Sequence, residues 1–431
     1  MINVSYLDLA GVARTKPKAA AEIDDIFNNG VKTAKANLAI NTLDALTPDS
    51  TLTVAHGDLS IMPDASTLAL PSYAPKTARF VGDLYELNGS PSSLCSRTVY
   101  RRVLEQAGSM GYQFVAGSEI EFHLVNQQDD RVVPADTSRI QSQAGYDFHQ
   151  AIMADFLAAL ESMNVHVIKT HVEGGRGQLE IDLAYGEGLK PADDIVYFKD
   201  AVKAVARQHG WIASFMPKIG HHWWGSGVHI HLSLHDPDGA NLLYDEGDER
   251  KLGLSQLGYH FMGGVLSHTR ALCAVAAPII NSYKRLLPGR WNADAVVYGP
   301  GHRGAAIRIP DERGKATRLE YRVPDTASNP YLLMACILAA GLEGIKRKID
   351  PRDPVTYDIS PMTDRERVAR GLTLLPRSLG EALGEFEKDR LFRETLGDTL
   401  FEEYIKNRAS EIQQAADQVT DWEVRHFLDL F

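Results

Sequence analysis

Five short segments of the chain alternate apolar residues with charged or imidazole side chains. Side chains two residues apart share one face of a β-strand, so within residues 115–124 Glu119 and Glu121 lie on one face and Ile120 and Phe122 on the other. The same alternation recurs in four more segments, residues 178–183, 228–234, 306–309 and 318–322. A single segment of this kind is typical of an ordinary half-exposed strand. Five of them predict one curved sheet whose concave face is lined with carboxylate, imidazole and guanidinium groups.

Elsewhere the pattern predicts a β-rich region followed by helices. Residues 2–15 predict a strand and a turn through Gly11, and residues 51–54 and 78–86 predict two further strands. A polar, turn-forming stretch follows them at residues 88–93. Helices are predicted beyond it at residues 96–110, 146–163, 194–209 and 329–347, and apolar residues have helical spacing within 146–163. The tail, residues 364–431, has mixed charge and few turn signals and is also predicted to be helical. We therefore expect an α+β protein with a small N-terminal domain at residues 1–95 and a large C-terminal domain at residues 96–431.

The composition indicates a globular protein. The chain has 431 residues and a formal net charge of -11, which disfavours nucleic acid and anionic membranes as partners, since both require a basic surface.

The longest apolar run, residues 331–342, is too short to span a bilayer and predicts a buried helix. No signal peptide is recognisable after Met1, so we expect a cytoplasmic protein. The three cysteines, Cys95, Cys273 and Cys336, lack metal-ligand spacing and are expected to be buried thiols.

The charged strand faces predict a site for divalent cations. Carboxylates that crowd together raise one another's pKa or require cations. The candidate ligands are five glutamates and one histidine: Glu119, Glu121, Glu173, Glu180, Glu320 and His229. A set dominated by carboxylate oxygen suits Mg²⁺ or Mn²⁺ better than zinc. Because arginines occupy neighbouring strands, the pattern also indicates nucleotide phosphates and phosphoryl transfer.

Five blocks of sequence cover parts of four of these segments and several of the turns between them. The blocks are Gly117-Ser-Glu-Ile-Glu-Phe122, Glu173-Gly-Gly-Arg-Gly-Gln-Leu-Glu180, Gly225-Ser-Gly-Val-His-Ile-His-Leu-Ser233, Asn281-Ser-Tyr-Lys-Arg-Leu-Leu-Pro-Gly289 and Arg318-Leu-Glu-Tyr-Arg-Val-Pro-Asp325. Taken in this order they resemble the glutamine synthetase family, and the resemblance covers nearly the whole chain. It implies a β-grasp-like N-terminal domain and a catalytic C-terminal domain built on a curved antiparallel sheet. It also implies a homo-oligomer, expected to be a stacked-ring dodecamer with each active site between neighbouring subunits.

The resemblance implies a role for each matching residue. Three glutamates would hold one metal ion: Glu121, Glu173 and Glu180. A second ion would be held by Glu119, His229 and Glu320. Three side chains would lie near ATP: Arg318, His231 and Ser233. The catalytic set would be the two arginines that contact the phosphoryl group together with one metal ligand: Arg303, Arg308 and Glu320. The glutamate substrate would be held by Arg285 and Arg322, with Gly225 beside it.

The implied reaction is an ATP-dependent ligation. The γ-carboxylate of L-glutamate would attack the γ-phosphate of ATP and form γ-glutamyl phosphate. An amine would then displace phosphate. Mg²⁺ or Mn²⁺ and the arginines would neutralise the charge at both steps.

Two positions depart from the members of the family that use ammonia. Those members carry a glutamate six residues after the arginine of the Asn281 block, and here that place is Trp291. A carboxylate there can bind ammonium and remove its proton, which a tryptophan cannot do. An indole can instead stack on a ring or attract a cation. The second change is Trp224, which replaces the asparagine expected before Gly225.

These changes favour an organic amine over ammonium. An aliphatic amine is largely protonated near pH 7, like lysine with its pKa of about 10.4, and still needs a base. An amine of the aniline type is already neutral, so the loss of a carboxylate would harm it least. We therefore expect an aromatic or bulky apolar amine, and the chain resembles the γ-glutamyl-amide ligase branch, which includes γ-glutamylanilide synthases.

Several alternatives remain open. In the first, Trp291 packs in a rebuilt loop while Asp294, or an aspartate of the neighbouring subunit, serves as the base. Asp44 falls at the family's ammonium-site aspartate when counted back without gaps from Asp58. The chain would then be an ordinary glutamine synthetase. The second alternative is a catalytically silent regulatory relative, and the intact metal and arginine sets argue against it. Tyr357 lies where some members are adenylylated, although a loop tyrosine is the commoner explanation.

Overall fold

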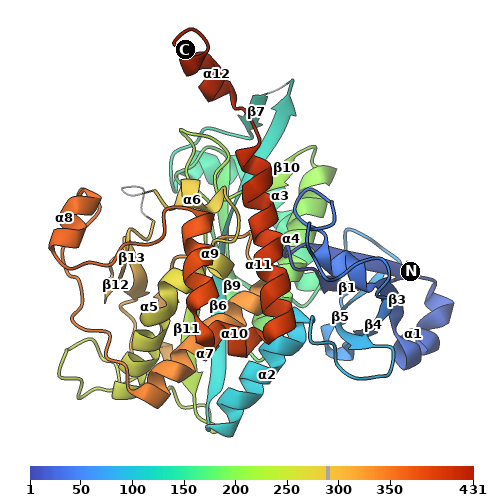
Figure 1. Cartoon of the computed structure of the whole chain (residues 1–431), viewed down its shortest axis with the longest axis horizontal. Coiled ribbons are helices and arrows are strands. Elements are labelled where there is room, and N and C mark those ends of the chain that lie inside the picture. Colours follow the sequence, from blue (N-terminus) through green and yellow to red (C-terminus); the bar gives the residue numbers. More distant parts are fainter. Residues whose placement is uncertain (130, 288–291) are drawn as a thin grey trace.

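Two β-sheets organise the protein, which we describe from a computed structural model for residues 1–129, 131–287 and 292–431 (Figure 1). The first sheet is formed by β1 (Ile2–Leu7), β2 (Ala13–Lys18), β3 (Val31–Ala34), β4 (Asp58–Pro63) and β5 (Ala78–Glu86). Its strand order is β2-β1-β5-β4-β3, and β1 and β5 run parallel while the other pairs are antiparallel. One short helix, α1 (Ile23–Asn29), packs on β4 through its buried Ile26. This arrangement is the β-grasp-like unit that the sequence predicts.

The strand predicted at residues 51–54 is wrong. The strand in this region is β4, which starts at Asp58. The backbone N–H and the hydroxyl of Thr51 instead donate to the carboxylate of Glu403, at 3.0 and 2.8 Å. Ser50 donates to the same carboxylate. A side chain from 352 residues away therefore satisfies polar groups that a strand partner would otherwise take.

The second sheet has nine strands and contains all five alternating segments. Its strands are β6 (Gln113–Gln128), β7 (Arg131–Pro134), β8 (Val167–Val172), β9 (Gln178–Glu187), β10 (Ile212–Ser214), β11 (Val228–His235), β12 (Ala295–Pro300), β13 (Ala305–Ile309) and β14 (Leu319–Tyr321). The main order is β12-β13-β14-β11-β6-β9-β8, with β7 and β10 also paired to β6. Only β12 and β13 run parallel among the pairs of the described strands. The prediction of one shared sheet is confirmed.

The helices follow the predicted order. They are α2 (Ser96–Ser109), α3 (Gln143–Ser162), α4 (Lys190–Gln208), α5 (Gln256–Ala276), α6 (Ser282–Arg285), α7 (Pro330–Arg347), α8 (Asp364–Ala369), α9 (Leu379–Lys388), α10 (Arg390–Leu396), α11 (Asp398–Ala416) and α12 (Asp421–Phe427). The apolar run becomes the buried helix α7, which begins after the side-chain cap Asn329 with Pro330 in the first turn. The sequence reading did not identify α1 or α5. No described helix is both long enough and apolar enough to cross a membrane.

The apolar side of the large sheet forms the core. Phe122 on β6 lies against Phe156 of α3 and Phe198 of α4, with ring centroids 5.8 and 6.0 Å apart. Burying each such side chain contributes about 1.5–3 kcal/mol. All three cysteines are buried, as predicted. Since helices cover the apolar side, the charged side of the same strands is left to form the candidate site.

Arg97 on α2 joins the small sheet to the helices. Its side chain is 3% exposed and forms ion pairs with Asp64 and Asp83 from the first sheet region and with Asp193 of α4. The Arg97 pair is part of why the pKa of Asp64 falls to about 2, against the opposing effect of burial. The division of the chain at residue 95 stays a prediction.

Candidate functional site

The charged face of the large sheet gathers side chains from four neighbouring strands. Glu119 on β6 is paired in register with His229 on β11, and Glu121 on β6 is paired with Glu180 on β9. Glu320 on β14 is paired with His231 on β11. Because successive residues of a strand point to opposite faces, this register brings carboxylates of separate strands onto one surface.

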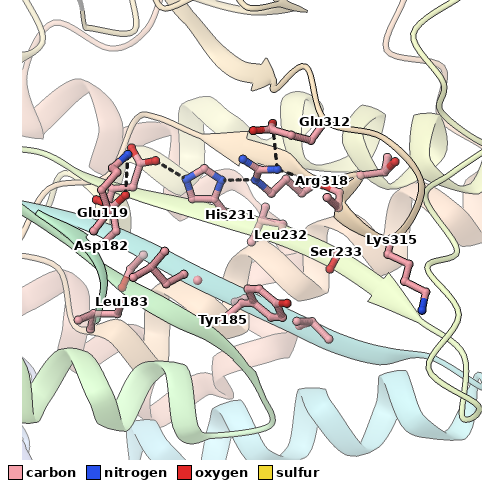
Figure 2. Close-up of a pocket in the computed structure, with 18 of the residues that line it drawn as sticks. Glu119, Asp182, Leu183, Tyr185, His231, Leu232, Ser233, Glu312, Lys315 and Arg318 are labelled. Atoms are coloured by element: carbon pink, nitrogen blue, oxygen red, sulfur yellow. Dashed lines mark hydrogen bonds and ion pairs between the residues drawn. The ribbon is translucent and has the colours of Figure 1, made fainter. Parts of the chain in front are cut away.

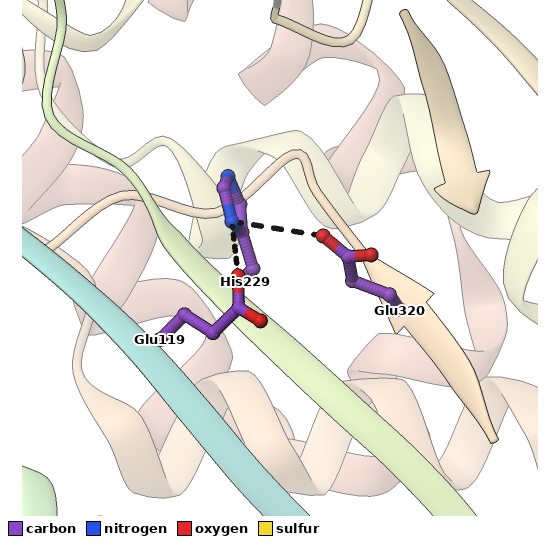
Figure 3. Close-up of side chains that lie close together, drawn as sticks. All are labelled: Glu119, His229 and Glu320. Atoms are coloured by element: carbon purple, nitrogen blue, oxygen red, sulfur yellow. Dashed lines mark hydrogen bonds and ion pairs between the residues drawn. The ribbon is translucent and has the colours of Figure 1, made fainter. Parts of the chain in front are cut away.

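Glu119, His229 and Glu320 form one compact group (Figure 3). Nδ1 of His229 lies 3.2 Å from Oε2 of Glu119 and 3.7 Å from Oε1 of Glu320. Glu320 is fully buried and His229 nearly so. Each of the three residues offers a ligand atom within 4.8 Å of the others. The structure thus brings together the side chains to which the family resemblance assigns one metal ion.

The carboxylates assigned to the other ion are divided between two overlapping groups. Glu121 and Glu180 converge with His229, while Glu173 and Glu180 converge with His171. Glu180 therefore links the two groups. His171 is not among the predicted ligands, although it lies two residues before Glu173 and the same alternation would have indicated it.

Burial controls the protonation of these carboxylates. It raises the pKa of Glu121 to about 7 and, together with the neighbouring Glu121, raises the pKa of Glu180 to about 10. Glu119 is half-buried, which raises its pKa, but hydrogen bonds from His229 and His231 outweigh that effect and hold the pKa well below the usual range. Burial, reinforced by Arg322, lowers the pKa of His229 to about 4, so this imidazole is neutral and can coordinate a metal.

These residues fit a divalent cation of the magnesium type. Glu180 is 6% exposed, and its side chain makes no hydrogen bond or ion pair with the part of the chain that the structure describes. A buried carboxylate without a cation is costly, and carboxylate oxygens with one imidazole suit Mg²⁺ or Mn²⁺.

The predicted arginines occupy three different environments. Arg308 on β13 donates to Oε2 of Glu320 at 2.5 Å, and Arg322 donates to Oε1 of the same carboxylate. Arg303 is exposed, and its backbone carbonyl accepts a hydrogen bond from Arg322 at 3.0 Å. Arg285 is 2% exposed and donates to the carbonyls of Val323 and Arg322 at 2.8 and 3.1 Å.

Glycines allow Arg285 to approach the loop before β11. A Cβ on Gly225 would lie 2.7 Å from Cγ of Arg285, and one on Gly227 would lie 2.4 Å from Nη2. The backbone N–H of Gly227 donates to Glu121 at 2.7 Å. The structure therefore places Gly225 and Arg285 side by side. The loop that contains Gly225 is also bonded to Glu121, one of the candidate metal ligands.

A cavity of about 440 Å³ adjoins the first carboxylate group (Figure 2). It is lined by Glu119 and by the three residues that the sequence places near ATP, Arg318, His231 and Ser233. Nε of Arg318 donates to Nδ1 of His231 at 3.1 Å, so Nε2 of His231 carries the proton and donates to Glu119 at 2.9 Å. The volume of this cavity is within the range of small-molecule sites.

The indole of Trp224 lies beside the group formed by His171, Glu173 and Glu180. A Cβ on Gly174 would be 2.6–2.8 Å from three ring atoms of Trp224, so the indole packs directly on the backbone after Glu173. Trp224 is 41% exposed. His123 holds this loop, because its Nε2 lies 3.3 Å from the carbonyl of Trp224 and its ring contacts Trp223 edge-on. Trp291 lies outside the described residues.

Other candidate residues lie away from these groups. The side chain of Asp44 is 80% exposed and pairs with Arg14 at 3.1 Å. Asp294 is fully buried and lies 4.0 Å from Arg367, an environment unlike that of a solvent-accessible base. Tyr357 is 39% exposed and its ring lies under the guanidinium of Arg370.

Comparison with known proteins identifies relatives along the whole chain. Residues 93–427 match the family described as the catalytic domain of glutamine synthetase. A glutamine synthetase of Thermotoga maritima is 38% identical over 388 residues, which cover 88% of this chain and 87% of that protein. A glutamate–methylamine ligase of Methyloversatilis universalis is 32% identical over 441 residues, which cover 100% of this chain and 96% of that protein. A solved complex of GmaS with ADP superposes with a TM-score of 0.88 at 32% identity, covering 99% of this chain and 96% of the other.

Proposed function

The chain belongs to the glutamine synthetase family, and from this premise we propose that it is an ATP-dependent ligase joining an organic amine to the γ-carboxylate of L-glutamate. One observation carries the proposal. Glu119 belongs both to the metal-type group with His229 and to the lining of the adjoining cavity, where His231 connects it to Arg318. A polyphosphate in that cavity would therefore end beside the carboxylates that hold divalent cations.

The residues fit the cofactors of this reaction. Glu119, His229 and Glu320 would hold one Mg²⁺ or Mn²⁺ ion, and Glu121, Glu173 and Glu180 a second, with His171 as an added candidate. Bound there, the metal supplies positive charge that stabilises the transferring phosphoryl group. ATP would lie along Arg318, His231 and Ser233.

The side chains would act on the substrates by orienting them and neutralising charge. Arg285, Arg322 and Gly225 would hold glutamate so that its γ-carboxylate attacks the γ-phosphate of ATP and releases ADP. Arg303 and Arg308 would contact the phosphoryl group in this step. The amine nitrogen would then attack the γ-carbonyl of γ-glutamyl phosphate, lose a proton and displace phosphate.

Trp224 supports an organic amine. Its partly exposed indole lies on Gly174, directly after Glu173, and gives this side of the site an apolar wall next to a carboxylate. Such a pair suits an amine with an apolar substituent, because the ring contacts the substituent or attracts the cation. An aromatic amine such as aniline, or a bulky apolar one, fits this wall. The relatives named above, a glutamine synthetase and a glutamate–methylamine ligase, match this chain at similar identity, so the choice of amine depends on the side chains.

The C-terminal helix supports a homo-oligomer. Helix α12 projects from the body and has no buried residue (Figure 1). Trp422, Leu428 and Phe431 are exposed around it, which is unusual for an isolated surface. We therefore retain a stacked-ring assembly, in which Asp44 of the partner subunit would reach the amine site.

Trapping of the acyl phosphate tests the proposal. Protein supplied with ATP, Mg²⁺, L-glutamate and hydroxylamine should form γ-glutamyl hydroxamate and ADP. Aspartate, one methylene shorter, is the matched control and should give little product. If neither hydroxamate nor ADP forms with glutamate, the ligase proposal fails and the silent-relative reading replaces it.

A further inference from the structure

The cavity beside Glu119 has cationic side chains on two opposite walls. Arg318 precedes β14 on one wall, where it contacts His231 and lies 3.2 Å from Glu312. Lys169 lies on β8, at the other end of the strand order β14-β11-β6-β9-β8. Three strands therefore separate the two cations and form the floor between them.

Asp182 of β9 holds Lys169 in place. Nζ of Lys169 lies 2.9 Å from Oδ2 of Asp182, and the two residues are paired in register. Asp182 is also paired in register with Glu119 on the next strand, β6. The ammonium group of Lys169 on β8 therefore lies on the same face of the sheet as Glu119, with β9 between the two strands.

The ion pair between Lys169 and Asp182 leaves one oxygen of Asp182 without a partner in the described structure and part of the Lys169 side chain exposed. Oδ1 of Asp182 is buried and has no hydrogen-bond partner among the described residues. The side chain of Lys169 is 48% exposed and lines the cavity. Lysine is a compact charge on a flexible stem, so this ammonium can exchange one oxyanion partner for another.

The charges of the cavity explain why a second cationic wall is needed. The acidic side chains Glu119, Asp182 and Glu312 are matched in number by Lys169, Lys315 and Arg318. A nucleoside triphosphate brings several additional negative charges. The carboxylate of Asp182 would repel the polyphosphate on its side of the cavity unless a cation faces the phosphates there.

We propose that Lys169 binds the polyphosphate of the nucleotide, opposite Arg318, with Asp182 presenting its ammonium to the cavity. The inference rests on the proposed function in one respect, that this cavity takes a nucleoside triphosphate. It assigns to the chain a phosphate contact that none of the five sequence blocks contains.

Calorimetric binding of ATP and adenosine to Lys169→Gln tests this assignment. The dissociation constant for ATP should rise about 10-fold or more, as expected for the loss of one charge-assisted hydrogen bond, while that for adenosine stays unchanged. Lys190→Gln is the matched control, because Lys190 lies outside this cavity and forms a similar ion pair. Its Nζ lies 2.8 Å from Oδ1 of Asp194, and the side chains of Lys190 and Asp194 are 43% and 9% exposed. This substitution should leave both constants unchanged.

A second substitution separates phosphate binding from simple neutralisation of Asp182. If Lys169 only compensates a buried carboxylate, adding Asp182→Asn to Lys169→Gln would restore ATP affinity, and the proposal would be overturned. We expect no restoration. Equal ATP affinity of the wild type and Lys169→Gln would also overturn the inference while leaving the ligase proposal intact, whereas a wild type that binds no ATP would overturn both.

Discussion

Glu121 on β6 and Glu180 on β9 lie directly opposite each other on neighbouring antiparallel strands. Like charges in this relationship are destabilising. Burial raises the pKa of both carboxyl groups, and a neighbouring carboxylate adds to the effect, Glu173 at Glu121 and Glu121 at Glu180. Such a pair persists in a fold where a cation compensates it. The pair therefore supports the proposal that divalent cations bind at this site.

The first prediction concerns pH and metal together. Both pKa values exceed the 4.5 of a free glutamate, so the folded protein holds protons that the unfolded chain has released. The metal-free fold should therefore lose stability as pH rises from 4.5 through about 7 for Glu121 and toward about 10 for Glu180. Metal competes with these protons, so Mg²⁺ or Mn²⁺ should raise the melting temperature more at pH 8 than at pH 6. An equal rise at both pH values in differential scanning fluorimetry would contradict this.

The second prediction concerns Glu320. Glu320→Gln should reduce turnover at least about 100-fold and weaken Mn²⁺ binding, since a ligand and its charge are lost together. Arg308 and Arg322 would lose their shared carboxylate, at a cost of about 3–5 kcal/mol of folding stability. Mn²⁺ titration followed by electron paramagnetic resonance measures the binding. Glu343→Gln, which removes an Arg347 ion pair on α7, is the control, and Mn²⁺ affinity in Glu320→Gln equal to that control would remove Glu320 from the metal site.

The third prediction concerns the contact between Gly174 and Trp224. Gly174→Ala would place a methyl group 2.6 Å from the indole, which must move. The KM for the organic amine should rise about 10-fold, the equivalent of about 1.4 kcal/mol, while the KM for ATP stays unchanged. Gly384→Ala on α9, where a Cβ meets nothing within 4 Å, makes the same chemical change without the clash. An unchanged amine KM in Gly174→Ala would separate Trp224 from the amine site.

The fourth prediction concerns α12. A chain ending at residue 417 lacks the exposed Trp422, Leu428 and Phe431 but no buried residue of that helix. The subunit should therefore fold with an unchanged circular dichroism spectrum apart from the helix removed, while the assembly becomes smaller. Light scattering after size-exclusion chromatography measures its mass. A truncated protein with the same number of subunits would show that α12 does not hold the assembly together.

The sequence predicts the parts of the site that depend on strand periodicity. Glu119, Glu121 and Glu180 were identified because a charged face repeating every two residues is visible in one dimension. His171 obeys the same rule and was missed, since β8 otherwise carries an ordinary mixture of residues. The division of Glu121, Glu173 and Glu180 between two groups depends on how β6, β9 and β8 pair, which periodicity does not encode.

Contacts between distant segments account for the remaining differences. The predicted strand near Thr51 fails because Glu403, far away in sequence, binds its backbone. The position of Trp224 against Gly174 likewise arises only because two loops far apart in sequence meet. Propensity describes a segment by itself, whereas such contacts are decided by tertiary packing.

The most direct test of the central claim is a comparison of amines in ATP- and glutamate-dependent phosphate release. Ammonium, methylamine, ethanolamine, isopropylamine, a polyamine and aniline would each be supplied over a range of concentrations, with the γ-glutamyl product identified by mass spectrometry. The account predicts that an organic amine, aromatic or bulky and apolar, gives the highest kcat/KM. Efficient turnover with ammonium alone would contradict it and make the protein an ordinary glutamine synthetase.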